Sequence, residues 1–338
     1  MDSLSQIVLG AAVGEAFVGK KIGNKALLWG AIMGTIPDLD VLIRPFISDV
    51  QELTHHRSLS HSVLFFILLA LAFGWLLRKV FPSSSVTFKD WTLLSFWCFV
   101  THSLLDCFTT WGTALFWPFP TRVAWQSIFV IDPLYTIPFL ILLIILMFYD
   151  KTDVKRRQLN TIALILSTAY LLFTLGNKVY MNKQFTQAAN EQHIKYTRIE
   201  TRPAPLQNIL WTANVETKNG FYLAYYSWFD KKPIQFNYFK KNHALLSKIN
   251  ENSDIETLKE MSKNLYTIEQ ISETEFIFND LRFGQLDGWA DNNSPFVFAY
   301  KIKQVGDNII INKIDVAKEA KTKRKSISSI LSSIWKRI

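Results

Sequence analysis

Long apolar runs fill the first half of the chain, and a more polar pattern replaces them after about residue 180. Two short runs, Leu4–Val18 and Ala26–Pro37, fit either tilted membrane spans or a re-entrant helical hairpin. Four further runs are long and apolar enough to cross a hydrocarbon core of about 30 Å: Ser58–Leu77, Trp91–Leu105, Val123–Tyr149 and Gln158–Asn177. We therefore expect an α-helical polytopic membrane domain of about six helical runs over residues 1–180.

Small residues recur in the two short runs. They are Gly10, Ala11, Ala12, Gly14, Gly30, Ala31 and Gly34. Side chains this small let two helix backbones approach closely in a membrane, so the pattern predicts that the two runs pack against each other.

The short loops predict how the chain is oriented. If all six runs cross, one set of loops holds Lys20, Lys21, Lys25, Arg78, Lys79, Lys89, Lys151, Lys155, Arg156 and Arg157, and the other set holds mainly Arg44, Arg57 and Arg122. The positive-inside rule makes the first set cytoplasmic. This count predicts a multi-pass protein of the cell inner (plasma) membrane, with its C-terminal domain on the outer face. The net charge of +9 then indicates lipid headgroups as partners, and we expect no nucleic acid.

Residues 181–316 have the pattern of a soluble α+β domain with an antiparallel sheet. Two strand-like runs over 208–229 flank Asn219-Gly220, which is a strong hairpin signal. Further strands are expected at 276–283, 296–303 and 308–314, and a helix at 255–265. Arg282 is a candidate contact for a substrate phosphate, and an ion pair with Asp280 is the alternative.

Residues 317–338 form a separate tail with basic residues and an apolar stripe at helical spacing. A basic amphipathic helix of this kind suits an anionic membrane surface. Docking on its own domain is the alternative, and nucleic-acid binding is disfavoured because it would leave the apolar stripe unused.

Polar and ionisable residues interrupt the apolar runs at positions that the six-crossing arrangement brings to one membrane face. The candidate metal ligands among them are Asp38, Asp40, His56, His61, His102 and Asp106. Ionisable groups in a membrane are costly and indicate a functional site. In 102–106 the spacing of four places imidazole and carboxylate on one helix face. Gln6 lies at the same face, and Glu15 lies nearer the other.

Mixed imidazole and carboxylate donors suit a divalent metal, zinc foremost, with manganese or iron as alternatives. Six donors would suffice for two ions. Such a metal activates water as a nucleophile and polarises a phosphoryl or carbonyl oxygen. Arg57 is placed to hold an anionic substrate oxygen and Asp132 to assist catalysis, so both are candidate catalytic residues. Gln6 and Glu15 are candidates for supporting the ligands.

Each of these residues could also have a purely structural role. Asp38 and Asp40 fit a loop cap, and His102 with Asp106 fits a buried hydrogen-bonded pair. Asp132 fits a helix N-cap, and Arg57 fits a contact with headgroup phosphates. Glu15 fits a pair with Lys20 or Lys21, and His55 fits an interfacial side chain without a role.

Four motifs in order resemble the YdjM-like family of inner-membrane metal-dependent hydrolases. They are Met1-Asp2-Ser3-Leu4-Ser5-Gln6 with Gly10, Pro-Asp-x-Asp at 37–40, His-Arg-x-x-x-His-Ser at 56–62 and His-x-x-x-Asp at 102–106. The resemblance covers about residues 1–180, and Asp280-Leu281-Arg282-Phe283-Gly284 looks like part of an extension found in one branch. It implies metal-ligand status for the six candidate ligands. Many members have histidine where this chain has Gln6, so Gln6 either supports a ligand or marks a changed metal preference.

The sequence therefore predicts a membrane-bound metal-dependent hydrolase that uses a metal-activated water on a lipid-linked or phosphoester substrate. A looser similarity in ligand types to zinc-dependent phospholipase C and related nucleases favours phosphoesters. The alternative is a non-catalytic membrane protein with a structural or sensory metal site. An ion pathway is disfavoured, because a pathway needs polar groups at several depths.

Overall fold

The computed structural model of the chain describes residues 1–82, 85–250, 252–316 and 327–337. The chain divides into two compact units. We call residues 1–43, 55–177 and 205–207 the membrane unit, and residues 44–54, 178–204 and 208–338 the sheet unit. Each unit is described by itself.

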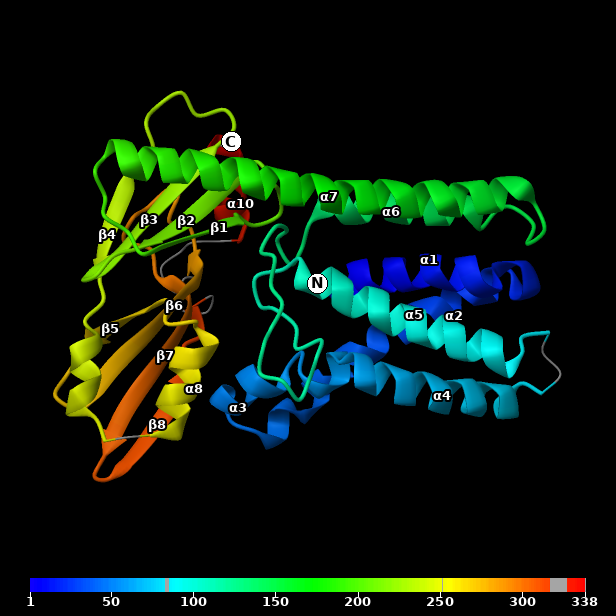
Figure 1. The fold of residues 1–338 in the computed structure, drawn as a ribbon, viewed down its shortest axis with the longest axis horizontal. Coiled ribbons are helices and arrows are strands. Elements are labelled where there is room, and N and C mark those ends of the chain that lie inside the picture. The colour runs from blue at the N-terminus through cyan, green and yellow to red at the C-terminus, as the bar shows by residue number, and fades with distance from the viewer. Residues whose placement is uncertain (83–84, 251, 317–326, 338) are drawn as a thin grey trace. The chain divides into compact units, whose positions relative to one another are not determined.

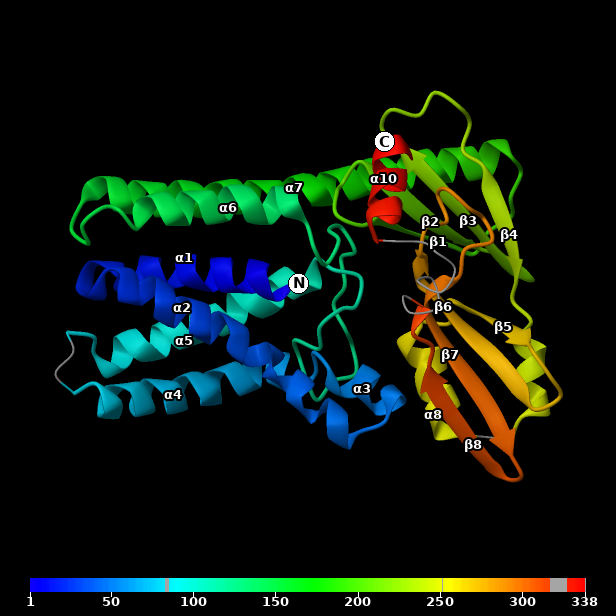
Figure 2. The same cartoon turned by 180° about the vertical axis from the view of Figure 1, so that it is seen from behind.

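The membrane unit is helical (Figure 1). Its elements begin with α1 (Ser3–Ile22), α2 (Asn24–Thr35) and the 3₁₀ segment η1 (Ile36–Phe46). They continue with η2 (Leu59–His61), α4 (Val63–Val80), α5 (Phe88–Cys107), α6 (Pro133–Leu146) and the part of α7 (Val154–Glu191) up to residue 177, whereas the rest of α7, the end of η1 and nearly all of α3 (Asp49–His55) belong to the sheet unit. Helices α1, α2, α4, α5 and α6 lie side by side in both views, around a core that includes Phe66, Trp91, Phe99 and Phe139 (Figures 1 and 2).

Three described helical segments are long and apolar enough to cross a membrane: Asn24–Phe46, Val63–Val80 and Val154–Glu191. The expected count of six is not confirmed. Helix α6 has only 14 residues, which is about 21 Å at 1.5 Å per residue and short for a full crossing. The predicted run Val123–Tyr149 therefore begins too early, since Asp132 caps α6 and the segment between α5 and α6 is irregular.

The close approach of α1 and α2 matches the pattern of small residues. A Cβ atom built on Gly10 would lie 2.4 Å from the Gly30 carbonyl oxygen, and one on Gly30 would lie 2.1 Å from the Gly10 carbonyl oxygen. Real side chains do not fit at such separations, so glycine is required at both positions. Gly23, with φ +59°, joins the two helices in a conformation that favours glycine.

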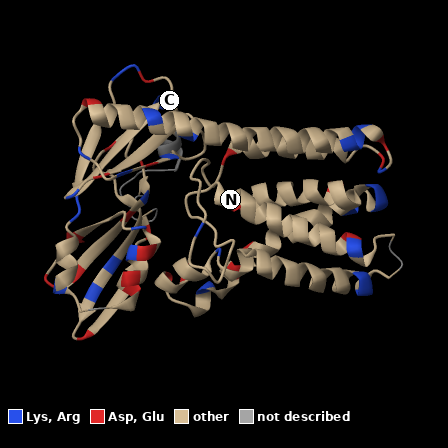
Figure 3. Ribbon diagram, in the orientation of Figure 1, with Lys and Arg blue, Asp and Glu red and all other residues tan. Residues whose placement is uncertain are grey.

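Basic residues gather at the end of the membrane unit away from the N-terminus (Figure 3). They include Lys20 and Lys21 in the last turn of α1, and Arg78 and Lys79 in the last turn of α4. The predicted membrane orientation depends on this distribution, because the positive-inside rule makes the basic end cytoplasmic.

The sheet unit contains two four-stranded antiparallel sheets, whereas the sequence predicted one. The first has the order β1-β2-β3-β4, with β1 (Arg198–Pro203), β2 (Leu210–Glu216), β3 (Gly220–Ser227) and β4 (Phe236–Lys240). The second has the order β5-β6-β7-β8, with β5 (Tyr266–Gln270), β6 (Glu275–Gln285), β7 (Phe296–Val305) and β8 (Asn308–Lys313). The 3₁₀ turn η3 (His243–Lys248) and helix α8 (Ser253–Met261) lie between them along the chain.

The Asn-Gly hairpin forms as predicted, with Glu216 opposite Phe221 at the end of β2 and β3. One face of the first sheet packs on the C-terminal part of α7, where Trp211 and Phe185 are fully buried. The other face meets the second sheet through Leu223 and Leu281. Burial of both faces explains why the strands lack a clean alternation of apolar and polar residues.

The tail helix α10 (Ile327–Arg337) makes contacts within the sheet unit. The Trp289 Nε1–H donates to Ser333 Oγ over 2.9 Å, and Arg337 pairs with Asp230. Ile334 is buried while Trp335 is exposed. These are contacts of a helix docked on its own domain, which was the alternative to membrane binding. Residues 317–326 of the predicted tail lie outside the described residues.

Candidate metal centre

Four of the six predicted ligands come together, and they are contributed by three separate segments. Asp38 lies in η1, His61 ends η2, and His102 and Asp106 lie one turn apart on α5. One ligand atom from each side chain lies within 4.8 Å of those of the others. We call these four residues the metal cluster.

Five of the six separations among the ligand atoms are close to those around a tetrahedral ion. The two histidine Nε2 atoms are 3.2 Å apart. Asp38 Oδ1 lies 3.3 Å from His61 Nε2 and 3.4 Å from His102 Nε2. Asp106 Oδ2 lies 3.4 Å and 3.6 Å from the same two nitrogens. Metal bonds of about 2.0–2.1 Å to nitrogen and oxygen give a tetrahedron with edges of about 3.3–3.4 Å, so these five separations suit a small divalent metal ion.

Hydrogen bonds on the far side of each imidazole leave both Nε2 atoms free to bind a metal. His102 Nδ1 lies 2.6 Å from the Gly34 carbonyl oxygen, which can only accept a proton. His61 Nδ1 lies 2.9 Å from Ser60 Oγ, whose own proton is donated to Asp40 Oδ2 over 3.0 Å. With Nδ1 protonated on both rings, two Nε2 lone pairs face each other. A cation between them would relieve that repulsion.

One carboxylate oxygen of Asp38 and one of Asp106 also lack well-formed hydrogen bonds. Asp38 Oδ1 and Asp106 Oδ2 are buried and accept no hydrogen bond of good geometry from the described residues, although Arg57 Nε forms an ion pair with Asp106 Oδ2 over 3.0 Å. A buried carboxylate oxygen without a donor is costly, and a metal ion is one of the few groups that would satisfy it. The donor set therefore fits a divalent cation.

Asp106 is held by other groups as well. Its Oδ2 forms an ion pair with Arg57 Nε over 3.0 Å, and its Oδ1 accepts from Gln6 Nε2 over 2.9 Å. The α-amino group of Met1 also contacts Oδ1. Gln6 therefore lies beside the metal cluster and supports a ligand, and Arg57 is directed at the cluster rather than at headgroups.

Asp40 and His56 are not members of the metal cluster. Asp40 Oδ1 lies 3.1 Å from His56 Nδ1, and Asp40 Oδ2 accepts from the Arg57 backbone N–H over 3.0 Å. The reason is geometric: a 3₁₀ helix has about three residues per turn, so residues two apart point in different directions. Asp38 faces the cluster, and Asp40 faces the turn that carries His56 and Ser60.

Several other predicted residues have structural partners. Asp132 caps α6, since it accepts from the Leu134 backbone N–H over 3.0 Å and from the Tyr170 hydroxyl over 2.9 Å. Arg282, in the sheet unit, is paired with Asp280 through contacts of 2.7–3.1 Å. Both arrangements are the structural roles that the sequence left open for these residues. His55 is exposed.

Glu15 lies away from the metal cluster, and neither sequence-based partner is correct. It forms a two-point ion pair with Arg156 of α7, with contacts of 2.7 Å to Nε and 2.6 Å to Nη2. Arg156 Nη1 also donates to Asn24 Oδ1 and to the Tyr149 carbonyl oxygen. The pair is almost completely buried, so it joins α1 to α7 at the basic end of the membrane unit.

The metal cluster is enclosed except at Asp38. His61, His102 and Asp106 are at most 1% exposed, whereas 22% of the Asp38 side chain is accessible. Asp40 and His56 are half-buried on the same side. The sequence did not indicate the Gly34 carbonyl, because a backbone acceptor has no residue-type signal, and it did not indicate Ser60, because serine hydroxyls are common and their partners are set by the fold.

A family model described as YdjM inner membrane protein matches residues 1–181. The chain belongs to the YdjM inner membrane protein family. The inner membrane protein YbcI of Escherichia coli (strain K12) is 30% identical over 108 residues, which is 32% of this chain and 61% of YbcI. The chain thus spans about three fifths of the length of the curated relative that it matches. No solved structure matches the chain. The matched region of the YdjM family model contains the whole metal cluster.

Proposed function

We propose that this YdjM family protein is a metal-dependent hydrolase of the membrane, and that Asp38, His61, His102 and Asp106 hold its divalent metal, zinc foremost. The observation that carries the proposal is the pair of Nε2 atoms at 3.2 Å, with a buried oxygen of Asp38 and one of Asp106 lying 3.3–3.6 Å from them and accepting no hydrogen bond of good geometry. A bound divalent metal would supply Lewis acidity and lower the pKa of a coordinated water.

Arg57 has the properties of an anion-binding residue at this site. It is 4% exposed, and it contacts Asp106 through Nε and Thr109 Oγ1 through Nη1 over 2.8 Å. The remaining guanidinium N–H groups suit a phosphoryl or carboxyl oxygen. Arg57 would thus orient an anionic substrate beside the metal cluster, which favours a phosphoester.

The Asp40–His56 pair provides a proton-transfer group next to the metal cluster. The Asp40 carboxylate fixes the ring through Nδ1, so His56 Nε2 is the atom that would take or give a proton. Asp40 also holds Ser60, which in turn orients His61. One carboxylate therefore organises both a metal ligand and a candidate acid–base residue.

The segment around Asp38 supports a lipid-linked substrate. Leu39, Leu42 and Ile43 of η1 are exposed, whereas Asp38 and Asp40 of the same segment face inward. Such a segment suits the membrane–water boundary, with its apolar side in lipid. A headgroup at that depth would lie near Asp38, the most accessible residue of the metal cluster.

A structural or sensory metal site is the second candidate, and one observation favours it. Four protein donors complete a tetrahedron, as in structural zinc sites, whereas catalytic sites keep one position open. A hydrolase would be active when it holds the metal, whereas a structural or sensory site would hold the metal without hydrolytic activity.

Metal analysis and a hydrolysis screen test the proposal. Purified protein should contain about one zinc per chain and should hydrolyse phospholipid or a chromogenic phosphoester. His61→Ala should lose both properties, and the matched control His55→Ala should keep both. Metal without hydrolysis in the wild type would favour the structural site, and absence of metal under zinc-replete conditions would exclude both functions.

We further propose that the metal cluster and the sheet unit lie on the outer face of the inner membrane. A periplasm-dependent reporter fused after Ile338 should be active, and a cytoplasm-dependent one should be silent. The opposite pattern would reverse the orientation.

A further inference from the structure

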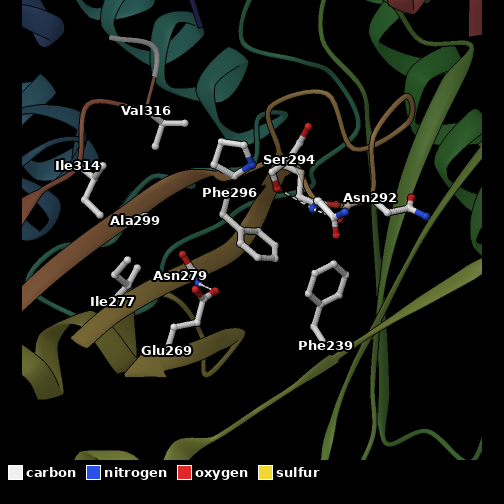
Figure 4. Close-up of a pocket in the computed structure, with 13 residues that line it drawn as sticks. Phe239, Glu269, Ile277, Asn279, Asn292, Ser294, Phe296, Ala299, Ile314 and Val316 are labelled. Atoms are coloured by element: carbon white, nitrogen blue, oxygen red, sulfur yellow. Dashed lines mark hydrogen bonds between the residues drawn. The ribbon is translucent and has the colours of Figure 1, made fainter. Parts of the chain in front are cut away.

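A hollow of about 360 Å³ lies in the sheet unit (Figure 4). It belongs to a different unit from the metal cluster, and nothing in the proposed function uses it. Its volume is within the range of small-molecule sites. Its walls come from both sheets and from the segment that precedes β7.

Strand register places polar and apolar side chains on one wall. Asn279 of β6 is opposite Ala299 of β7, and Ile277 is opposite Glu269 of β5. Figure 4 shows Asn279 and Glu269 close together below Phe296. The Phe296 and Phe239 rings meet edge to face, with centroids 5.4 Å apart, and form an aromatic corner beside that wall.

The side-chain amide donors of Asn279 and Gln285, two of the lining residues, are already used. Asn279 Nδ2 donates to Glu269 Oε1 over 2.7 Å and contacts Thr267 Oγ1 at 3.4 Å. Gln285 Nε2 donates to the carbonyl oxygens of Asn292 and Ser294 over 2.8 Å and 2.7 Å. Asn279 therefore presents its Oδ1 as an acceptor, and Glu269 keeps its second carboxylate oxygen.

The charge of the hollow has one sign. Glu269 is the only charged residue among the lining residues that the structure describes. No described lysine or arginine forms an ion pair with it, and its side chain is exposed to solvent. A phosphate or carboxylate ligand would meet a carboxylate and no cation here, so anionic groups are disfavoured.

We propose that this hollow binds an organic ammonium group. A carboxylate, an amide oxygen and two aromatic rings are the groups that recognise ammonium ions, through charge, hydrogen bonding and cation–π attraction. The ammonium lies between Glu269 and the Phe239–Phe296 corner. Its source is either a free amine, such as choline or ethanolamine, or the headgroup of an amine-bearing phospholipid.

Calorimetric titration of the full-length protein in detergent tests the proposal. The probes are choline, ethanolamine and the neutral alcohol in which carbon replaces the choline nitrogen. At least one amine should bind, and the neutral alcohol should bind at least about tenfold more weakly than choline, as expected when the charge attraction to Glu269 and the cation–π attraction are lost. Nanodiscs of phosphatidylethanolamine, compared with phosphatidylglycerol, test the lipid source.

Glu269→Gln is the decisive variant, because its side chain is exposed and the change preserves shape. It should weaken binding by about tenfold or more, whereas Glu273→Gln, an exposed carboxylate outside the lining, should leave binding unchanged. Phe296→Leu should also weaken binding. Saturable binding of free amine or of phosphatidylethanolamine that depends on Glu269 supports the proposal and identifies the source. Equal binding of the neutral alcohol, insensitivity to Glu269→Gln, or no binding in either format overturns it.

Discussion

His61 and His102 point their Nε2 atoms at each other across 3.2 Å, although each ring is already fixed through Nδ1. A bound metal would convert this repulsive contact into a stabilising one. We therefore expect chelation to lower the Tm of the purified protein by at least about 5 °C and zinc to restore it, since a ligand at 100 times its Kd contributes about 2.7 kcal/mol. His61→Ala should show no such response. A wild-type Tm that ignores both chelator and zinc would contradict a metal at this place.

Asp40 is expected to affect the reaction more than metal binding, because it contacts His56 directly and reaches the cluster residue His61 only through Ser60. Asp40→Asn should keep its zinc and lower kcat by about a hundredfold or more, the usual contribution of acid–base catalysis. Metal content and hydrolysis are measured on the same sample. Asp150→Asn, at an exposed loop, is the control. Complete loss of zinc from Asp40→Asn under zinc-replete conditions would instead indicate that Asp40 is itself a metal ligand.

The contact between α1 and α2 leaves no room for a methyl group. Gly30→Ala would press its Cβ on the Gly10 carbonyl and should destabilise the protein by about 1–3 kcal/mol. Gly176→Ala is the matched control, since nothing lies within 4 Å of its added Cβ and alanine favours a helix. Thermal unfolding in detergent should separate the two. Equal Tm values would mean that α1 and α2 do not pack this closely.

The buried pair of Glu15 and Arg156 should be strongly coupled. Removing one partner with Glu15→Ala leaves an unpaired buried guanidinium and should cost about 3–5 kcal/mol. The double variant with Arg156→Met should be more stable than Glu15→Ala alone. Lys21→Ala, which breaks a partly exposed pair with Asp90, should cost less than about 1 kcal/mol. Additive single and double effects would argue against the contact.

His243 predicts a pH dependence in the sheet unit. Burial lowers the pKa of His243 below its ordinary value, while its Nε2 lies 2.8 Å from the Tyr266 carbonyl oxygen and its ring stacks on Tyr266. The unfolded chain takes up a proton near pH 6.5 and the folded one resists it, so this contribution is present above about pH 6.5 and is lost as pH falls. The stability advantage of wild type over His243→Gln should shrink between about pH 7.5 and pH 5.5. A constant or growing advantage would show that the sign is wrong.

The six candidate ligands from the sequence include all four residues of the metal cluster, but the sequence did not show which candidates lie together in space. His102 and Asp106 were identifiable because a spacing of four on a helix puts side chains on one face. Asp40 and His56 were predicted as ligands but lie outside the metal cluster, since residue type alone does not reveal that η1 is a 3₁₀ segment whose two aspartates diverge. The partner of Glu15 was missed because Arg156 is far away in sequence and was counted among the loop charges.

The second unit shows a similar limit. The hairpin at Asn219-Gly220 has a local turn signal, and it was predicted correctly. The division into two sheets depends on contacts such as that between Leu223 and Leu281, which no local pattern records. Strands β1, β4 and β5 were not predicted, because strands buried on both faces or at an edge lack the simple alternation.

Gly34 connects the helix packing to the chemistry. Its carbonyl oxygen fixes the tautomer of His102, and its missing side chain lets Gln6 approach, since an added Cβ would lie 2.8 Å from the Gln6 carbonyl oxygen. Gly34 has no side chain to bind a metal, yet it helps to set the positions of both the candidate ligand His102 and its neighbour Gln6. Any metal affinity of the proposed site should therefore depend on the distance between two helix backbones, and a single methyl group at position 34 should alter it while leaving every candidate ligand in the sequence unchanged.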